Sequence, residues 1–270
     1  MTAPLNQTAL VTGASSGIGA VYADRLAHRG YDLILVARDK ARMDTLAERL
    51  RAETGRTIEV LPADLTDRAD LARVEDRLAG DAAISLLVNN AGLSMTGDLI
   101  TVEPQEAERL IALNITAPTL LAGAAGKAFV ARGGGSIVNI ASVLALLPEG
   151  FDGVYSGSKA YLLNLSQSLS AQYGDKGLYV QAVLPGATRT EIWERSGKDV
   201  DSFPAEWVMD VNDLVDASLV GFDRRETITI PPLADDQLPH WDAINTARGA
   251  LSGQLSKRVV GDRYREAAIA

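Results

Sequence analysis

The 270-residue sequence contains no cysteine and only two histidines, His28 and His240. Without cysteine the chain can form neither disulfides nor thiolate metal ligands. Two histidines leave little from which to build a histidine metal site or a Ser-His-Asp triad. These absences disfavour a disulfide scaffold, a zinc enzyme and a triad hydrolase, and no metal is expected.

Clusters of basic residues and long apolar runs are also lacking. Lys and Arg number 26 against 35 Asp and Glu, which gives a formal net charge of −9. Nucleic-acid-binding proteins usually present a basic face, so no nucleic-acid partner is expected. No apolar run reaches the ~18–20 residues that span a bilayer, and the first residues, MTAPLNQTALV, lack the apolar core of a signal peptide. We therefore expect a cytoplasmic protein without membrane contact.

Short aliphatic segments alternate with longer amphipathic segments along the chain. The expected strands are residues 8–12, 32–36, 58–61, 85–88, 136–141, 179–184 and 227–230. The expected helices are residues 17–29, 40–53, 68–79, 104–132, 153–173 and 239–255. Several strands are continuously apolar, which is typical of a parallel sheet covered on both faces. The pattern predicts an α/β Rossmann fold, a doubly wound parallel seven-stranded sheet with helices on both faces. No linker interrupts it, so residues 1–270 are assigned to a single domain with a C-terminal extension over 231–270.

The first strand ends in a glycine-rich loop, Thr12-Gly13-Ala14-Ser15-Ser16-Gly17-Ile18-Gly19. Glycines permit a tight turn and close approach of a pyrophosphate, which the free N–H groups of the following helix can bind. An ordinary turn is the alternative, because glycine patterns alone are weak signals. The position at the first strand-to-helix junction favours a dinucleotide site. Its predicted contacts are Gly13, Ser15, Ser16, Gly17, Ile18 and Gly19.

The residues that follow the second and third strands bear on which cofactor binds. Ala37 cannot accept a hydrogen bond from the adenosine ribose, whereas Arg38 suits a 2′-phosphate. A solvated surface arginine is the alternative, and Asp39 beside it is expected to cap the next helix. Asp64, followed by Leu65, would either contact the adenine or cap a helix. We predict NADP(H) as the preferred cofactor and NAD(H) as a possible one.

Two asparagines, Asn89 and Asn90, end the fourth strand before Ala91 and Gly92. Asparagine tolerates unusual backbone angles and hydrogen-bonds neighbouring main chain. A plain turn is the alternative. We expect Asn90, Ala91 and Gly92 to shape the backbone beside the cofactor.

A Tyr–Lys pair, Tyr155 and Lys159, lies four residues apart on an expected helix, so the two share a face. Such pairs are common on helix surfaces, but Ser142 directly follows the fifth strand, at the ligand edge of the sheet. In an earlier helix, Pro118 stands four residues after Asn114 and cannot donate to its carbonyl. We expect a kink that releases this oxygen, rather than an early end of the helix.

Together these segments resemble the short-chain dehydrogenase/reductase family over about residues 7–230. The motifs that carry the resemblance are Thr12–Gly19, Asn89–Gly92, Asn114, Ser142, Tyr155-x-x-x-Lys159 and Pro185-Gly186, in the order and spacing of that family. The resemblance implies an NADP(H)-dependent oxidoreductase, a ketone or aldehyde reductase that forms a homodimer or homotetramer. The implied catalytic residues are Asn114, Ser142, Tyr155 and Lys159. Further implied cofactor contacts are Tyr155, Lys159, Pro185, Gly186, Thr188 and Thr190.

The chemistry of hydride transfer gives these residues roles. A hydride delivered to a carbonyl carbon leaves an alkoxide, which needs a proton. A free tyrosine has a pKa of about 10, and lowering it towards 7 requires ~4 kcal/mol in favour of the phenolate. We expect the Lys159 ammonium and the positive nicotinamide ring to lower the pKa of Tyr155. Ser142 would hydrogen-bond the substrate oxygen.

The substrate pocket is expected to be apolar, with residues 191–203 as a mobile lid or, alternatively, a plain surface helix. The candidate pocket residues are Ser94, Met95, Ser142, Leu144, Phe151, Ile192 and Trp193. The C-terminal extension would roof the pocket or pack on a partner subunit. Subunit pairing is expected through helices 104–132 and 153–173. Their proposed outward positions are Ala117, Leu121, Ala124, Leu162, Leu165 and Leu169.

A non-catalytic NAD(P)-binding regulator of the same fold is the main alternative function, since fold alone does not determine activity. An epimerase-, racemase- or dehydratase-like activity is another. The presence of Ser142, Tyr155 and Lys159 together favours the oxidoreductase, because a sensor has no need of a tuned phenol.

Overall fold

The computed structural model describes residues 7–150, 152–255 and 258–261. Phe151, a candidate pocket residue, and the first six residues, on which the signal-peptide expectation partly rests, lie outside the described residues. The chain divides into two compact units, Met1–Pro231 and Pro232–Ala270. The assignment of all 270 residues to a single domain stays a prediction.

The first unit is built on a parallel sheet of seven strands within the described residues, in the order β3-β2-β1-β4-β5-β6-β7. This is the doubly wound Rossmann arrangement that the alternation of segments predicted. The strands are β1 (Thr8–Thr12), β2 (Asp32–Ala37), β3 (Ile58–Pro62), β4 (Ile84–Asn89), β5 (Gly135–Ile140), β6 (Leu178–Val183) and β7 (Ile228–Thr229).

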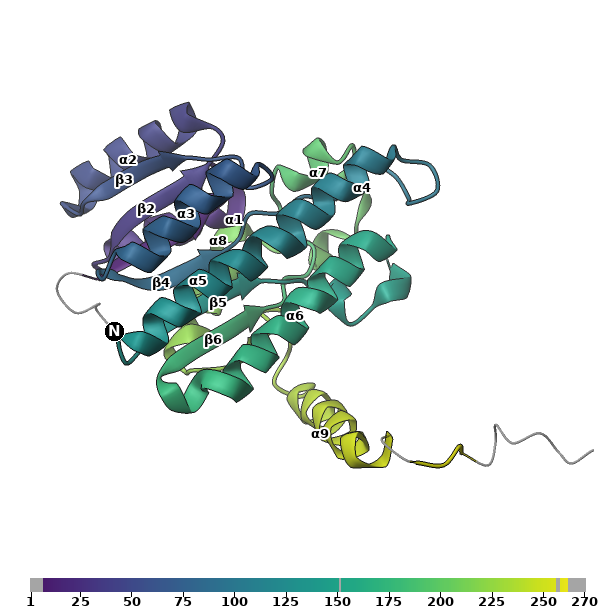
Figure 1. The fold of residues 1–270 in the computed structure, drawn as a ribbon. Helices are drawn as coiled ribbons and strands as arrows, with labels where there is room; N and C mark the ends of the chain where they lie inside the picture. The colour runs from purple at the N-terminus through teal and green to yellow at the C-terminus, as the bar shows by residue number, and fades with distance from the viewer. Residues whose placement is uncertain (1–6, 151, 256–257, 262–270) are drawn as a thin grey trace, which may run out of the picture. The chain divides into compact units, whose positions relative to one another are not determined.

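Helices cover both faces of this sheet (Figure 1). The α-helices are α1 (Gly17–His28), α2 (Lys40–Thr54), α3 (Arg68–Gly80), α4 (Pro104–Ile111), α5 (Ala117–Ala131), α6 (Gly153–Tyr173), α7 (Ile192–Arg195) and α8 (Val211–Asp223). A π-helical turn, η1 (Ala112–Thr116), joins α4 to α5. Short 3₁₀ turns are η2 (Val143–Ala145), η3 (Pro148–Gly150), η4 (Gly174–Lys176), η5 (Val200–Ser202) and η6 (Ala205–Trp207).

Two apolar cores hold the layers together. One packs α1, α2 and α8 on one face of the sheet, and includes Tyr22, Met43 and Leu219. The other packs α3 and α5 on the opposite face, and includes Val74 and Phe129. These side chains are at most 2% exposed, so burial of apolar surface on both faces holds the strand ends in place.

The long expected helix over residues 104–132 is interrupted by η1, next to Pro118. Within the turn, the N–H of Ala117 bonds to the carbonyl of Ala112, five residues back. A π-helical turn of this kind is a recognised source of helix kinks. Since the helix continues as α5, the alternative of an early end at Pro118 is wrong, and the kink itself stays a prediction.

Among the described residues, Pro104–Ala131 is long and apolar enough to cross a membrane by length and composition alone, a test that core helices of soluble proteins also pass. Several of its side chains belong to the core beside α3.

The expected outward positions Ala117, Leu121 and Leu162 are wrong, because each is 3% exposed or less within the chain's own core. They face inward because the sheet side of each helix needs small and apolar residues.

The second unit contains α9 (Leu238–Leu255), close to the helix expected over residues 239–255. Four of its apolar side chains are exposed: Leu238, Ile244, Leu251 and Leu255.

Candidate active site and dinucleotide cleft

The sequence-predicted site residues gather at the carboxyl edge of the sheet. β2 and β3 lie on one side of β1, and β4 lies on the other. The strand order therefore reverses between β1 and β4, where open α/β sheets bind ligands. The loops after β1 to β6 carry most of the residues singled out above, while η1 carries Asn114 and α6 carries Tyr155 and Lys159.

The glycine loop after β1 has the geometry that a pyrophosphate requires. Gly13 and Gly17 have φ of +66° and +54°, in the left-handed region that favours glycine. A Cβ on Gly19 would lie 2.3 Å from the carbonyl oxygen of Gly13. Ser16 precedes α1 without capping it through its side chain, so the first N–H groups of α1 keep their capacity to bind an anion. The residues present thus fit a dinucleotide.

Asn90 shapes this loop as expected. Its Nδ2 donates to the carbonyls of Thr12 and Gly13 at 2.9 and 3.3 Å. The Thr12 hydroxyl in turn accepts the main-chain N–H groups of Asn90 and Ala91, both at 3.0 Å. These bonds join the ends of β1 and β4, and a Cβ on Gly92 would lie 3.6 Å from the Lys159 Nζ. Asn89 instead belongs to the core, where it bonds Asn139 at 2.9 Å.

The end of β2 presents Ala37 and an exposed Arg38. Asp39 caps α2, as predicted, by accepting the N–H of Arg42 at 3.1 Å. Asp64 caps no helix; its carboxylate closes a turn by accepting the N–H and hydroxyl of Thr66. Burial raises the pKa of Asp64, but the bonds from Thr66 and the charges of Arg38 and Arg109 outweigh it and lower the pKa overall. Asp64 therefore stays ionised near Arg38.

Ser142, Tyr155 and Lys159 are brought together by β5 and α6. The Asp152 carboxylate caps α6 by accepting the N–H of Tyr155 at 2.7 Å, which sets where the helix begins. The Lys159 Nζ lies 5.5 Å from the centre of the Tyr155 ring and donates to the Ile140 carbonyl at 2.9 Å. The Ser142 hydroxyl hydrogen-bonds the Tyr155 side chain.

Burial dominates the pKa values of this group in the protein alone. Burial and the charge of Asp152 raise the pKa of Tyr155 to about 12, against the lowering effect of the bond from Ser142. Burial lowers the pKa of Lys159 to about 8. Lys159 is thus still mainly cationic at neutral pH, and the net effect of the protein's own groups is to raise the pKa of the phenol. At neutral pH Tyr155 carries its proton, as a proton donor must.

Asn114 lies in the π-helical turn, 2% exposed. Its side chain donates to the Leu93 carbonyl and the Ser158 hydroxyl at 2.9 and 3.2 Å, and accepts the N–H of Leu93 at 3.0 Å. This side chain therefore fastens the loop after β4 to α6. Its main-chain oxygen is the group that Pro118 cannot engage.

The loop after β6 lies against the glycine loop. A Cβ on Gly17 would lie 3.4 Å from the Thr190 side chain, so the position predicted to bind nicotinamide adjoins the first turn of α1. Thr188 is 5% exposed, and its hydroxyl bonds the Gly186 carbonyl at 3.1 Å. Thr188 therefore stabilises this loop from within.

The expected lid, residues 191–203, is a chain of short turns rather than one helix. Trp193 packs on Phe203 with ring centres 5.1 Å apart, and its indole N–H donates to the Thr188 carbonyl at 2.8 Å. The Trp193 side chain therefore contacts the lid and the loop that leads to it. Among the other candidate pocket residues, Met95 is fully buried. Ser94, Leu144 and Ile192 are partly buried.

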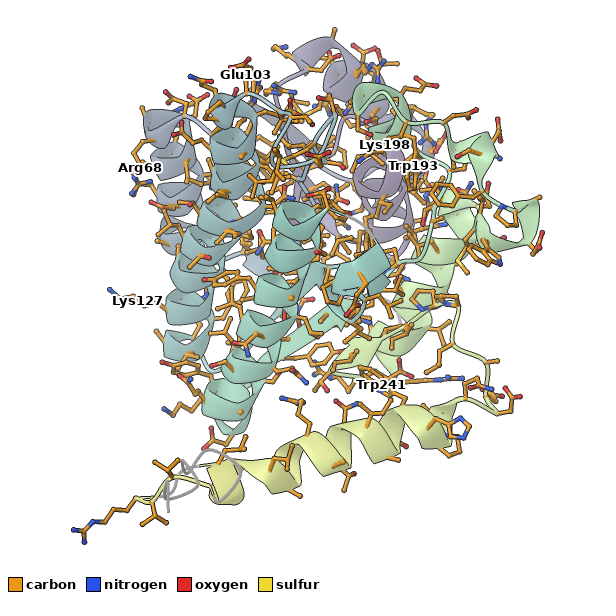
Figure 2. The ribbon with its side chains drawn as sticks, turned by 90° about the vertical axis from the view of Figure 1, so that its right-hand side faces the viewer. Arg68, Glu103, Lys127, Trp193, Lys198 and Trp241 are labelled. Carbon is orange, nitrogen blue, oxygen red and sulfur yellow. The ribbon has the colours of Figure 1, made fainter. Side chains whose placement is uncertain are left out.

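Lys198 is a site residue that the sequence reasoning missed. Its ammonium donates to the Ser94 hydroxyl and the Met95 carbonyl at 3.2 and 3.0 Å, which ties the lid to the loop after β4. Figure 2 shows Lys198 beside Trp193, whose carbonyl accepts the Lys198 N–H at 2.8 Å. Burial lowers its pKa, opposed by the charges of Asp152 and Glu106. No local motif marks this lysine, because its partners lie about a hundred residues away in sequence.

One group of potential metal ligands occurs among the described residues: Asp24, His28 and Glu53. Asp24 is already paired with Arg25 and Arg49, each at 2.8 Å. Two guanidinium groups on this carboxylate oppose cation binding.

The fold and this group of site residues define a nicotinamide-dinucleotide-dependent Rossmann enzyme. The family model for short chain dehydrogenases matches residues 7–201, and the chain belongs to this family of NAD(P)-dependent oxidoreductases. Among curated proteins, the chain is 32% identical to 17-beta-hydroxysteroid dehydrogenase type 3 of Mus musculus over 208 residues, which cover 75% of this chain and 68% of that protein. The match to the human protein of the same name covers 61% of its length.

Two solved structures match nearly the whole chain. A short-chain dehydrogenase from Sphingobium yanoikuyae in complex with NADPH is 53% identical, with a TM-score of 0.92, and the match covers 96% of this chain and 100% of that one. The bulky-bulky ketone specific alcohol dehydrogenase from Comamonas testosteroni is 49% identical, with a TM-score of 0.87, covering 96% and 98%. The predicted C-terminal extension is therefore largely shared with both.

Proposed function

We propose that this enzyme reduces ketones that carry two bulky substituents, and oxidises the corresponding secondary alcohols, with NADP(H) as cofactor. The observation that carries the proposal is the grouping of Ser142, Tyr155 and Lys159 beside the glycine loop. A regulator without catalysis has no use for a protonated phenol held between a hydroxyl and a buried ammonium.

Ser142, Tyr155 and Lys159 each have a separate role in reduction. The nicotinamide cofactor, when bound, supplies the hydride. The Ser142 hydroxyl holds the substrate oxygen and stabilises its developing negative charge. The Tyr155 hydroxyl then donates its proton to that oxygen, which completes the alcohol. Lys159, cationic at neutral pH, favours the phenolate that Tyr155 becomes.

The preference for NADP(H) rests on the end of β2. Ala37 offers no carboxylate to the adenosine ribose, and the exposed Arg38 can form a charge-assisted bond to a 2′-phosphate. Asp39 is turned towards the N–H of Arg42 at the start of α2. The related Sphingobium yanoikuyae structure contains NADPH, which supports the same choice here.

The substrate class is proposed from the relative that is named for bulky-bulky ketones, 49% identical over 96% of this chain. The buried Met95 and the partly buried Leu144 and Ile192 are consistent with an apolar pocket. A cytoplasmic location and a homodimer or homotetramer are also proposed.

A panel of ketones with NADPH tests the proposal, with cofactor oxidation followed at about 340 nm. The panel compares cyclohexyl phenyl ketone with acetophenone and acetone. We expect kcat/KM for the first to exceed that for acetone at least about tenfold, since an apolar pocket gains affinity with each buried methylene. A preference for acetone would refute the bulky-ketone assignment. No turnover of any ketone or aldehyde would refute the reductase.

A further inference from the structure

Three charged side chains from distant parts of the sequence meet beside the glycine loop. The Arg42 Nη1 donates to both carboxylate oxygens of Glu191, at 2.8 and 2.7 Å. The Arg195 Nη2 lies 2.5 Å from one of these oxygens and 3.2 Å from the Ser16 hydroxyl. We call Arg42, Glu191 and Arg195 the Glu191 clasp.

The clasp connects elements that lie along the expected path of the cofactor. Arg42 belongs to the first turns of α2, four residues after Arg38. Glu191 directly follows Thr190 at the start of the lid, and Ser16 precedes α1. A dinucleotide that extends from Arg38 past the start of α1 to Thr190 passes all the elements that the clasp joins.

The charges of the clasp join the lid to α2 as ion pairs. The bonds from Arg42 lower the pKa of Glu191, with Arg195 adding to the effect, so the carboxylate stays ionised at neutral pH. The Asp39 carboxylate lies 3.5 Å from the Arg42 Nε, so two guanidinium groups face two carboxylates and their charges balance. The Arg195 guanidinium also bonds the Ser16 hydroxyl at 3.2 Å, at the start of α1, where the backbone fits a pyrophosphate.

We propose that the Glu191 clasp retains the bound dinucleotide by fastening the lid to α2, so that the cofactor leaves only when the clasp opens. The proposal rests on the dinucleotide binding that the proposed function requires. The three side chains are between 39% and 57% exposed, which limits the strength of each ion pair. Loss of one such exposed pair, in which a single Arg42 nitrogen contacts both carboxylate oxygens, should therefore accelerate release by about three- to fivefold.

Stopped-flow release of NADPH tests the clasp in the full-length protein. The bound cofactor is displaced by excess NADP⁺ and its fluorescence is followed, for wild type, Arg42→Gln, Glu191→Gln and the double variant. We expect each single variant to release NADPH about three- to fivefold faster. The double variant should be no faster than Glu191→Gln, because Arg42 then has no partner in the lid left to lose; its other partner, Asp39, precedes α2. NADH release should change by the same factors.

Arg49→Gln is the matched control, since it removes one arginine of α2 whose partners, Asp24 and Glu53, both at 2.8 Å, lie in α1 and α2 and not in the lid. Its release rate should equal that of wild type. Unchanged release from Arg42→Gln and Glu191→Gln would overturn the clasp. The clasp would also be overturned if the release rate of the double variant rose by the product of the two single effects. The same holds if Arg42→Gln accelerated the release of NADPH but not of NADH. Either result would mean that Arg42 acts on the cofactor directly. Failure of the wild type to bind NADPH would instead overturn the proposed function itself.

Discussion

Lys159 is a buried cation, and its burial should be measurable as a dependence of stability on pH. Burial lowers its pKa from 10.5 to about 8. The unfolded chain therefore binds more protons than the folded one between these two values, so stability rises with pH across this window. A shift of this size corresponds to a folding penalty of about 3 kcal/mol below pH 8, relieved as the pH approaches 10.5.

The test compares wild type with Lys159→Met, which keeps most of the length of the side chain and removes its charge. The free energy of unfolding of both proteins is measured by urea denaturation at four pH values between about 7 and 9.5. Subtracting the value for the variant from that for wild type at each pH removes the contribution of all other titrating groups. The difference should rise by about 2 kcal/mol across this range. The bond from Lys159 to the Ile140 carbonyl offsets part of the penalty. A difference that stays flat within about 0.5 kcal/mol would show that Lys159 is solvated, against the reasoning.

Three further predictions concern the cofactor loops and the kinked helix. Wild type should bind NADPH at least about tenfold more tightly than NADH, and Ala37→Asp/Arg38→Ala should lose that preference in paired titrations. Pro118→Ala should raise stability by about 1 kcal/mol and lower kcat, because the carbonyl of Asn114 regains a donor; unchanged kcat would contradict this. Gly19→Ala should lower the melting temperature and weaken NADPH binding, whereas Gly123→Ala, where a Cβ meets nothing within 4 Å, should do neither.

Much of the architecture was predictable because it depends on local patterns. The parallel, doubly wound sheet followed from apolar strands that alternate with helices. The glycine loop and the Tyr155–Lys159 pair followed from short motifs. The helix α8 was missed although its signal was present. Val211, Leu214, Val215 and Leu219 follow helical spacing, and Asp210 supplies the cap.

The parts that could not be predicted depend on contacts between distant segments. Pro118 indicated a kink, but only the structure shows that a π-helical turn absorbs it. The pairing of Glu191 with Arg195 follows i,i+4 spacing and was accessible from sequence. Its pairing with Arg42, 149 residues away, was not. The effect of burial on the pKa of Tyr155, which outweighs the bond from Ser142, also depends on the packing around the ring and not on the motif.

The central claim is that Tyr155 donates the proton during reduction of a ketone by NADPH. The most direct test is Tyr155→Phe, which removes the hydroxyl and keeps the ring that lies 5.5 Å from the Lys159 ammonium. Turnover of the best ketone from the panel and NADPH affinity are measured side by side on both proteins. The account predicts that kcat falls by about 10²-fold or more while NADPH affinity stays within about twofold of wild type. Near-normal turnover by Tyr155→Phe would contradict it.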